Sequence, residues 1–308
     1  MVNVKLKLKN IFFGNREKSG LIVLLAIYII LIGLGFVFLY PVLYMFVNSF
    51  KSASDIVDPS VTWVPISLCF ENFQRAYLVL DYPKSLLRSL AMSLGPAMLQ
   101  TLSLAFISYG LARFRIPGKK FWIIMLIAAY IIPSQVTLVP QYIQYESLKL
   151  INTPFVSLLP SLLGQGIKSS IFVLVFYQFY STYPKSFDEA AEIDGAGAFQ
   201  TWWKIALPMV GPALLVTFLF TFIWNWNETD KSGMFFGSAI PTLPMKLQNL
   251  VDTYSHLYET SDYSATNKLN EAIRLAGTLL TIAPLLIIYT VIQRYFIESI
   301  ERSGITGE

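Results

Sequence analysis

Six long apolar stretches constrain this chain more than any other feature of its sequence. Five of them contain no charged side chain, and the sixth contains one, Lys168. A helix needs roughly 20 apolar residues to cross the hydrocarbon core of a bilayer, and every stretch is about that long or longer. The stretches are Leu21–Val47, Ser89–Ala112, Phe121–Tyr145, Leu150–Pro184, Ile205–Asn227 and Leu275–Gln293. They predict six transmembrane helices in one membrane domain, residues 21–297.

Composition supports an all-α, polytopic membrane protein. Of 308 residues, 55% are hydrophobic and 14% are charged, whereas soluble domains carry about 25% charged residues. The stretches do not alternate between apolar and polar residues, as barrel strands do. The chain has one cysteine, Cys69, and one histidine, His256, so neither an intrachain disulfide nor a His/Cys metal site is expected.

Basic residues in short loops predict the orientation of the spans. The segment 1–20 contains five basic residues, and the loop after the second stretch contains Arg113, Arg115, Lys119 and Lys120. These segments lie on the same side of an alternating topology. We therefore expect both termini, the loop 181–208 and a C-terminal tail of residues 298–308 to be cytoplasmic. The segments 48–88 and 228–274 are then external.

The loop 181–208 carries an ordered pattern, E-A-A-x3-G-x9-I-x-L-P. Ser186 and Glu189 have the spacing of a capping box, which predicts a short helix over 187–194. Gly195 and Gly197 predict a turn, and a second short helix is expected to end near Ile205. Pro208 is expected to open the next span, where a missing N–H is tolerated.

This pattern resembles the cytoplasmic coupling loop in permease subunits of binding-protein-dependent ABC importers. All seven anchor positions stand at the family spacing, and Asp194 adds a charge near the helix end. The coupling residues implied are Glu189, Ala190, Ala191, Asp194, Gly195, Ile205, Leu207 and Pro208. Further stretches, among them Ile116–Lys120 and Trp224–Asn225, are similar to the maltose-type carbohydrate branch. The sequence departs from that branch at Trp226–Asp230.

The resemblance implies a type I ABC importer permease that translocates a carbohydrate, in the form of an oligosaccharide. It implies a second, different permease subunit, two ATPase subunits that bind the ATP, and an extracytoplasmic binding protein. The chain itself is then neither an enzyme nor the holder of a cofactor. It would lie in the bacterial cytoplasmic membrane, with its C-terminal tail between the ATPase subunits.

Two other functions fit a polytopic membrane protein. The same class of importer could carry a peptide or an acidic saccharide. An ion-coupled secondary transporter would usually have intramembrane acids, and none of the six stretches contains an internal Asp or Glu.

Candidate residues of the substrate path are Lys168, Trp224 and Asn225. A charge within a membrane span commonly faces a cavity, although a lysine near the interface can also extend its ammonium to water. Trp224 could stack on a sugar ring or belong to an interfacial aromatic belt.

Overall fold

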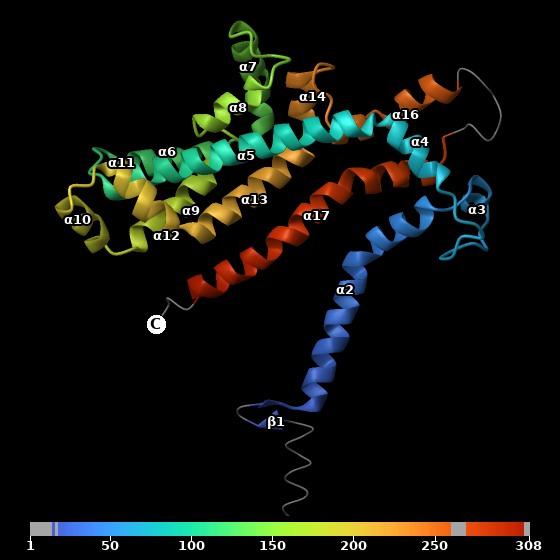
Figure 1. Ribbon diagram of the computed structural model, residues 1–308, viewed down its shortest axis with the longest axis horizontal. Helices are drawn as coiled ribbons and strands as arrows, with labels where there is room; N and C mark the ends of the chain where they lie inside the picture. Colours follow the sequence, from blue (N-terminus) through green and yellow to red (C-terminus); the bar gives the residue numbers. More distant parts are fainter. Residues whose placement is uncertain (1–13, 16–17, 260–268, 305–308) are drawn as a thin grey trace, which may run out of the picture. The chain divides into compact units, whose positions relative to one another are not determined.

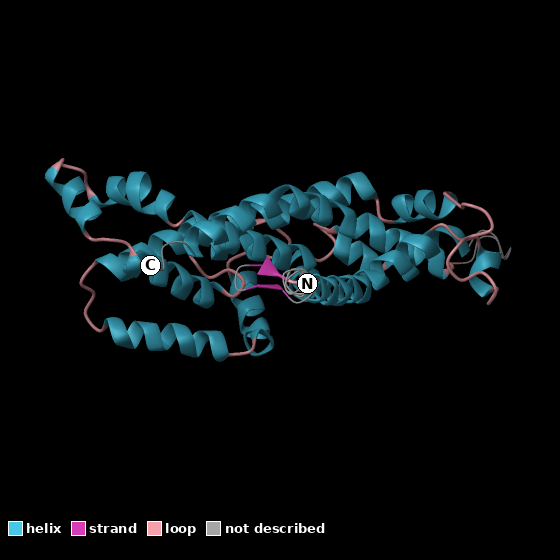
Figure 2. Ribbon diagram, turned by 90° about the horizontal axis from the view of Figure 1, so that it is seen from below, coloured by secondary structure: helices cyan, strands magenta, loops and turns pink. Residues whose placement is uncertain are grey.

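The computed structural model describes residues 14–15, 18–259 and 269–304. Helices make up most of this part of the chain (Figure 2), which confirms the predicted all-α class. One short hairpin pairs β1 (Gly14–Asn15) with β2 (Lys18–Ser19) in antiparallel register. The chain forms two compact units, Met1–Ala76 with Leu269–Leu279, and Tyr77–Lys268 with Leu280–Glu308.

The first unit is built on one long apolar helix. It contains α2 (Leu21–Ser49), α3 (Ala53–Val57) and the start of α4 (Glu71–Val79). An uncharged segment in lipid must pair its backbone polar groups internally, which accounts for the 29 helical residues of α2. The side-chain amide of Asn72 donates to the carbonyls of Ser49 and Lys51, at 2.9 Å each. Asn72 therefore fixes the chain just after α2 to the start of α4.

The second unit contains the remaining helices (Figure 1). They are α5 (Tyr82–Arg113), α6 (Lys119–Ile131), α7 (Ser134–Ser147), α8 (Phe155–Leu162), α9 (Ser169–Thr182), α10 (Ser186–Ile193), α11 (Ala198–Thr201), the π-helix η1 (Trp202–Ala206), α12 (Leu207–Met209), α13 (Gly211–Asn227), α14 (Asp230–Phe236), α15 (Leu243–Gln248), α16 (Leu250–Tyr254) and the π-helix η2 (Ser255–Glu259). The last helix, α17 (Glu271–Gly304), begins in the first unit.

The centre of the second unit is α5, on which α8, α9 and α13 all pack (Figure 1). Small residues let helix backbones approach closely in membrane proteins, and α5 buries a row of them at helical spacing. These are Ser85, Ser89, Ser93, Ala97, Ala105 and Ser108. Large side chains, including Phe176, Tyr180 and Trp202, complete the core beside Leu104 of α5. The packing makes α5 the helix that joins the other parts of this unit.

Three helices within the described residues are long and apolar enough to cross a membrane: Leu21–Ser49, Tyr82–Arg113 and Glu271–Tyr295. Two bent pairs raise the possible number to five. One is α6 with α7, bent by 98°, and the other is Ala198–Met209 with Gly211–Asn227, bent by 81°. The predicted count of six spans therefore stays a prediction.

The predicted stretch Leu150–Pro184 is not one continuous helix. It forms α8, of 8 residues, and α9, of 14 residues, separated by an irregular connection that includes Gly164 with φ +73°. The last helix, α17, continues into the predicted tail as far as Gly304, and the cytoplasmic position of that tail stays a prediction. Residues 1–13, 16–17, 260–268 and 305–308 of the predicted terminal and external segments lie outside the described residues.

Candidate functional site

The predicted coupling segment begins with α10, and its start differs from the capping-box prediction. Ser186 is the first helical residue, Lys185 is the N-cap, and no side chain caps the helix. Lys185 already has helical backbone angles, so its carbonyl accepts from the amides of Asp188 and Glu189 at 3.0 and 3.1 Å. Asp188 and Glu189 still lie in the first turn, where negative charge is favoured by the helix dipole.

The turn after α10 is confirmed at Gly195, which has φ +81°. Its amide donates to the carbonyl of Glu192 at 3.0 Å, and the amide of Ala196 donates to that of Ala191 at 2.9 Å. This is the hydrogen-bond pattern of a Schellman motif, which needs a left-handed residue after the helix. Gly197 has ordinary extended angles as the N-cap of α11, so only Gly195 requires glycine for its backbone conformation.

The second half of the segment is more irregular than predicted. The expected single helix to Ile205 is instead α11 followed by the π-helix η1 and the short α12. Pro208 lies within α12, and the next span begins after Val210 with Pro212 in its first turn. The prediction that Pro208 opens the next span is therefore wrong, because α13 begins three residues later.

The predicted coupling residues divide into an exposed and a buried group. Glu189, Ala190, Asp194, Gly195 and Pro208 are exposed, whereas Ala191 and Leu207 are buried and Ile205 is half-buried. The buried members fix the segment to the rest of the unit, and the exposed members form part of its outer surface. Apolar residues extend that outer surface. They are Phe187, Ile193, Phe199 and Trp203, and Ile193 is 86% exposed.

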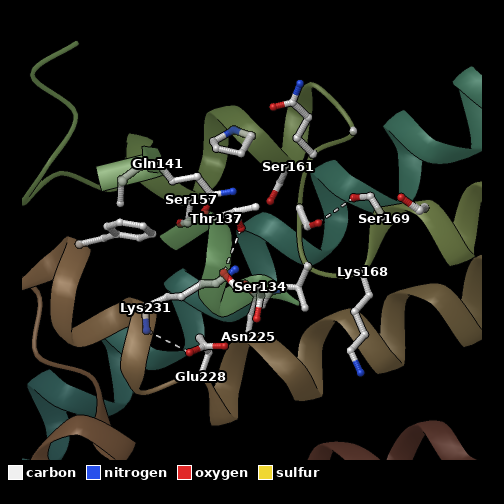
Figure 3. A pocket seen from close by; sticks show the side chains of 18 of the residues that line it. Ser134, Thr137, Gln141, Ser157, Ser161, Lys168, Ser169, Asn225, Glu228 and Lys231 are labelled. Carbon is white, nitrogen blue, oxygen red and sulfur yellow. Dashed lines mark hydrogen bonds between the residues drawn. The ribbon is translucent and has the colours of Figure 1, made fainter. Parts of the chain in front are cut away.

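A second candidate site is a cavity of about 930 Å³. Its wall comes from the break between α6 and α7, from α8 and its connection to α9, and from the ends of α13 and α14 (Figure 3). Its polar side chains include Ser134, Thr137, Gln141, Ser157, Ser161, Lys168, Asn225, Glu228 and Lys231. Irregular backbone at membrane depth is tolerated where it lines a cavity, and both breaks in the helices lie at this one.

Lys168 lies in the break between α8 and α9, rather than inside a helix as the sequence indicated. It is the N-cap of α9 with φ +51°, and its side chain extends toward α13 (Figure 3). There its Nζ lies 4.5 Å from the ring centroid of Trp224, within the range of a cation–π interaction. No ion pair joins Lys168 to a carboxylate within the described residues.

The other two path candidates have different places. Asn225 lines the cavity, and its amide donates to the carbonyl of Thr221 at 2.8 Å. Trp224 packs against Phe172 and is not part of the cavity wall. Lys168 and Asn225 therefore both line the cavity, whereas Trp224 contacts the ammonium of Lys168 without lining the cavity itself.

Glu228 is the one acidic side chain among the described residues that line the cavity. Its side-chain Oε1 accepts a hydrogen bond from the backbone amide of Lys231 at 3.0 Å. Within residues 14–15, 18–259 and 269–304, no group of three or more His, Cys, Asp or Glu side chains is arranged to hold a metal ion.

Comparison with known proteins gives the family. The model of the family described as "Binding-protein-dependent transport system inner membrane component" matches residues 10–302. The chain belongs to this family. The family resemblance found in the coupling pattern is thus confirmed, and the protein is a membrane component of a binding-protein-dependent transport system.

Individual relatives of this transport component are permeases. The chain is 27% identical to the probable ABC transporter permease protein YurM of Bacillus subtilis, over 87% of this chain and 84% of the relative. It is 26% identical to the arabinooligosaccharides transport system permease protein AraQ of Halalkalibacterium halodurans, over 89% and 93%.

The fold has a solved counterpart. The transport component superposes with a TM-score of 0.73 on a chain from the crystal structure of a bacterial ABC transporter involved in the import of the acidic polysaccharide alginate. The match covers 89% of this chain and 96% of the other at 21% identity. It confirms the importer-permease fold.

Sequence reasoning missed most of the polar groups that line this permease's cavity. Ser134, Thr137, Gln141, Ser157 and Ser161 are uncharged polar residues scattered within apolar stretches. Their signal was weak because isolated hydroxyls can bond to the backbone of their own helix, as Thr137 does to the carbonyl of Ser134 at 2.9 Å. Only the three-dimensional arrangement shows that they face one space.

Proposed function

We propose that this protein is a membrane-spanning permease subunit of an ATP-driven importer that translocates a carbohydrate, an oligosaccharide delivered by an extracytoplasmic binding protein. The observation that carries the proposal is the polar cavity of about 930 Å³ in a chain of an import family. Ligand sites are typically about 300–1,000 Å³, so the cavity has room for a saccharide of a few units. The relative AraQ, named for arabinooligosaccharide transport, supports the substrate class.

The cavity has the chemistry that a saccharide needs. Its hydroxyls can donate and accept, and Gln141 and Asn225 each add a carbonyl oxygen and an amide NH₂ group. A neutral sugar can exchange water hydrogen bonds for these groups at small net free energy, which suits a path through which substrate must also leave.

The coupling segment supplies the connection to ATP. The exposed surface of α10 around Glu189, Ala190 and Gly195 would bind an ATPase subunit, and the buried Ala191 and Leu207 would pass its movement to the spans. Hydrolysis would occur on two separate ATPase subunits, so this chain would be no enzyme and bind no cofactor. A second, different permease subunit would complete the path.

For the arrangement of the chain in the membrane, we propose the layout that the sequence predicts. The segment 1–20, the loop 181–208 and the tail 298–308 would be cytoplasmic, with a permease domain over 21–297 in the bacterial cytoplasmic membrane. The segments 48–88 and 228–274 would face outward, toward the binding protein.

An uptake assay tests the function. The assembled transporter in proteoliposomes, with ATP inside and the binding protein with labelled oligosaccharide outside, should accumulate label. Omission of ATP or of the binding protein should stop accumulation. Uptake driven by a proton or sodium gradient without ATP would overturn the proposal in favour of a secondary transporter.

Labelling tests the topology. In a background in which Cys69 is replaced by serine, single cysteines at Pro117 and Ser238 should react from opposite sides of the membrane. Both positions are exposed and uncharged, so the basic-residue count of the loops is unchanged. Reaction of both from outside intact cells would contradict the layout.

An acidic saccharide is a second candidate substrate. Lys168 and Lys231 line the cavity together with one acid, Glu228, and the Nζ of Lys168 contacts an aromatic ring rather than a carboxylate. Competition between neutral and uronate-containing oligosaccharides in the uptake assay separates the two candidates.

A further inference from the structure

A charged pair joins the end of α5 to the start of the coupling helix α10. Arg113 is in the last turn of α5, and its Nε lies 2.8 Å from Oδ2 of Asp188. The side chain of Arg113 is 7% exposed and that of Asp188 is 18% exposed. The Nε–H bond does not point at the carboxylate oxygen, so the contact is an ion pair without a well-directed hydrogen bond.

Arg113 also holds the end of α9. Its Nη2 donates to the carbonyls of Tyr183 and Pro184, at 3.1 and 3.3 Å. These carbonyls follow the last residue of α9, Thr182, where unpaired acceptors and the helix dipole favour a cation. One guanidinium therefore contacts the chain on both sides of the corner at which α9 turns into α10.

Tyr183 completes the group, and we call Arg113, Tyr183 and Asp188 the corner cluster. The guanidinium carbon of Arg113 lies 3.7 Å from the ring centroid of Tyr183. The Tyr183 hydroxyl donates to Oδ1 of Asp188, so both carboxylate oxygens have partners. Burial, and then donation to Asp188, raise the pKa of Tyr183 above its usual value. The hydroxyl therefore stays protonated and remains a donor.

The same helix, α5, contacts the wall of the cavity. Its residue Gln100 is fully buried, and the side-chain amide donates to the carbonyl of Ile167 at 2.8 Å and to Oγ of Ser169 at 3.1 Å. Ile167 and Ser169 flank Lys168 and line the cavity. A Cβ at Gly166 would lie 2.1 Å from Oε1 of Gln100, so the amide of Gln100 and this backbone are in close contact.

The two contacts are joined by unbroken helix. Gln100 and Arg113 are thirteen residues apart in α5, which at 1.5 Å per residue is about 20 Å. A helix buried against α8, α9 and α13 moves as a rigid body over such a distance more readily than it bends.

We propose that Arg113, Tyr183 and Asp188 are positioning residues that tie the coupling helix to α5, so that displacement of α10 by an ATPase moves the cavity wall at Ile167–Ser169. This inference rests on the proposed function, in which α10 docks an ATPase. The ion pair keeps α10 in register with α5, and Gln100 passes the displacement to the backbone beside Lys168. If the corner cluster served only to stabilise the fold, its loss would not change how a movement of α10 reaches the cavity wall.

The decisive experiment compares Arg113→Gln, Asp188→Asn and the double variant in the assembled transporter in proteoliposomes. Saccharide uptake and ATP hydrolysis are measured on the same preparation. Coupling between two sites typically corresponds to a factor of roughly 5–150, so we expect uptake per ATP hydrolysed to fall about fivefold or more. Because each single change already breaks the pair, the double variant should be no worse than the singles. Arg115→Gln is the control, because Arg115 is exposed and the substitution removes the same charge as Arg113→Gln does.

A corner cluster that only stabilised the fold would give a different pattern of uptake and hydrolysis. If the variants lower uptake and hydrolysis in parallel, if their effects multiply in the double variant, or if Arg115→Gln matches them, the inference is wrong. Retention of wild-type uptake per ATP by both single variants would also contradict it.

Hydrogen exchange keeps the inference separate from the substrate assignment. In the wild-type complex, a non-hydrolysable ATP analogue should change amide exchange at 164–169, and Asp188→Asn should abolish that change without loss of assembled complex. This readout needs no saccharide. A wild-type complex that shows the exchange change but takes up no saccharide would contradict the proposed substrate alone. An exchange change that survives in Asp188→Asn would overturn the role of the corner cluster.

Discussion

Replacement of Gly195 by serine tests the coupling segment through a single backbone conformation. Gly195 has φ +81°, and no atom lies within 4 Å of the position that a Cβ would take. A serine there meets no steric contact and is opposed only by the left-handed backbone, at about 1–2 kcal/mol. That free energy is a factor of roughly 5–30 in the equilibrium constant for forming the turn.

The matched control is the same substitution two residues later. Gly197 has φ −71° and ψ 161° as the N-cap of α11, and its Cβ position is also free. Serine is a preferred N-cap residue, so Gly197→Ser should be neutral or slightly stabilising. Gly195→Asn should lie between wild type and Gly195→Ser, because asparagine enters the left-handed region more easily than other residues.

The assay is binding of the purified ATPase subunit to the permease complex, together with uptake. We expect Gly195→Ser to lower the affinity by up to the factor of roughly 5–30 that the turn loses. Gly195→Pro should abolish transport, because proline fixes φ near −65° and removes the N–H that donates to Glu192. Equal effects of serine at 195 and 197, or unchanged uptake in Gly195→Pro, would refute the reasoning.

Three further predictions concern other regions. Glu189→Lys reverses an exposed charge in the first turn of α10 and should weaken ATPase binding, measured by co-purification; undiminished recovery of the ATPase would contradict its place in the contact. Lys168→Met should leave membrane insertion unchanged but reduce uptake, most for an anionic saccharide. Lys149→Met is its control, since Lys149 also has a left-handed backbone (φ +56°) but does not line the cavity; equal uptake by the two variants would withdraw Lys168 from the path. Deletion of residues 303–308 should reduce ATP hydrolysis stimulated by loaded binding protein, and full stimulation would show that the tail does not contact the ATPases.

The apolar stretches predicted the helical class because lipid leaves an uncharged segment few alternatives. They could not predict where helices break. Pro41, Pro96 and Pro284 lie inside continuous helices, whereas Pro133 lies in the 98° bend between α6 and α7. Each of these prolines lacks a backbone N–H, and whether the helix continues depends on what packs beside it. That information is not local in the sequence.

The coupling segment was predictable to the extent that its signals are local. Gly195 and the short helix α10 follow from neighbouring residues, and both are present. The corner cluster is different, because Arg113 and Asp188 are 75 positions apart in sequence and no spacing rule connects them. Arg113 was assigned only to the basic loop that orients the spans, and its ion pair becomes visible once α5 and α10 are placed together.

The π-helix η1 has a consequence for the length of the coupling segment. Buried pairs recur five residues apart, at Thr201–Trp202 and at Ala206–Leu207, while Trp203 between them is exposed. A π-helical turn holds one residue more than an α-helical turn, and one residue corresponds to about 100° of rotation in an α-helix. Removing a single residue from 202–206 would restore the α-helical repeat and rotate the exposed side of Phe199 away from its present direction relative to α13. The number of residues between Gly195 and Leu207, and not only their chemical type, therefore sets which surface this segment presents to an ATPase.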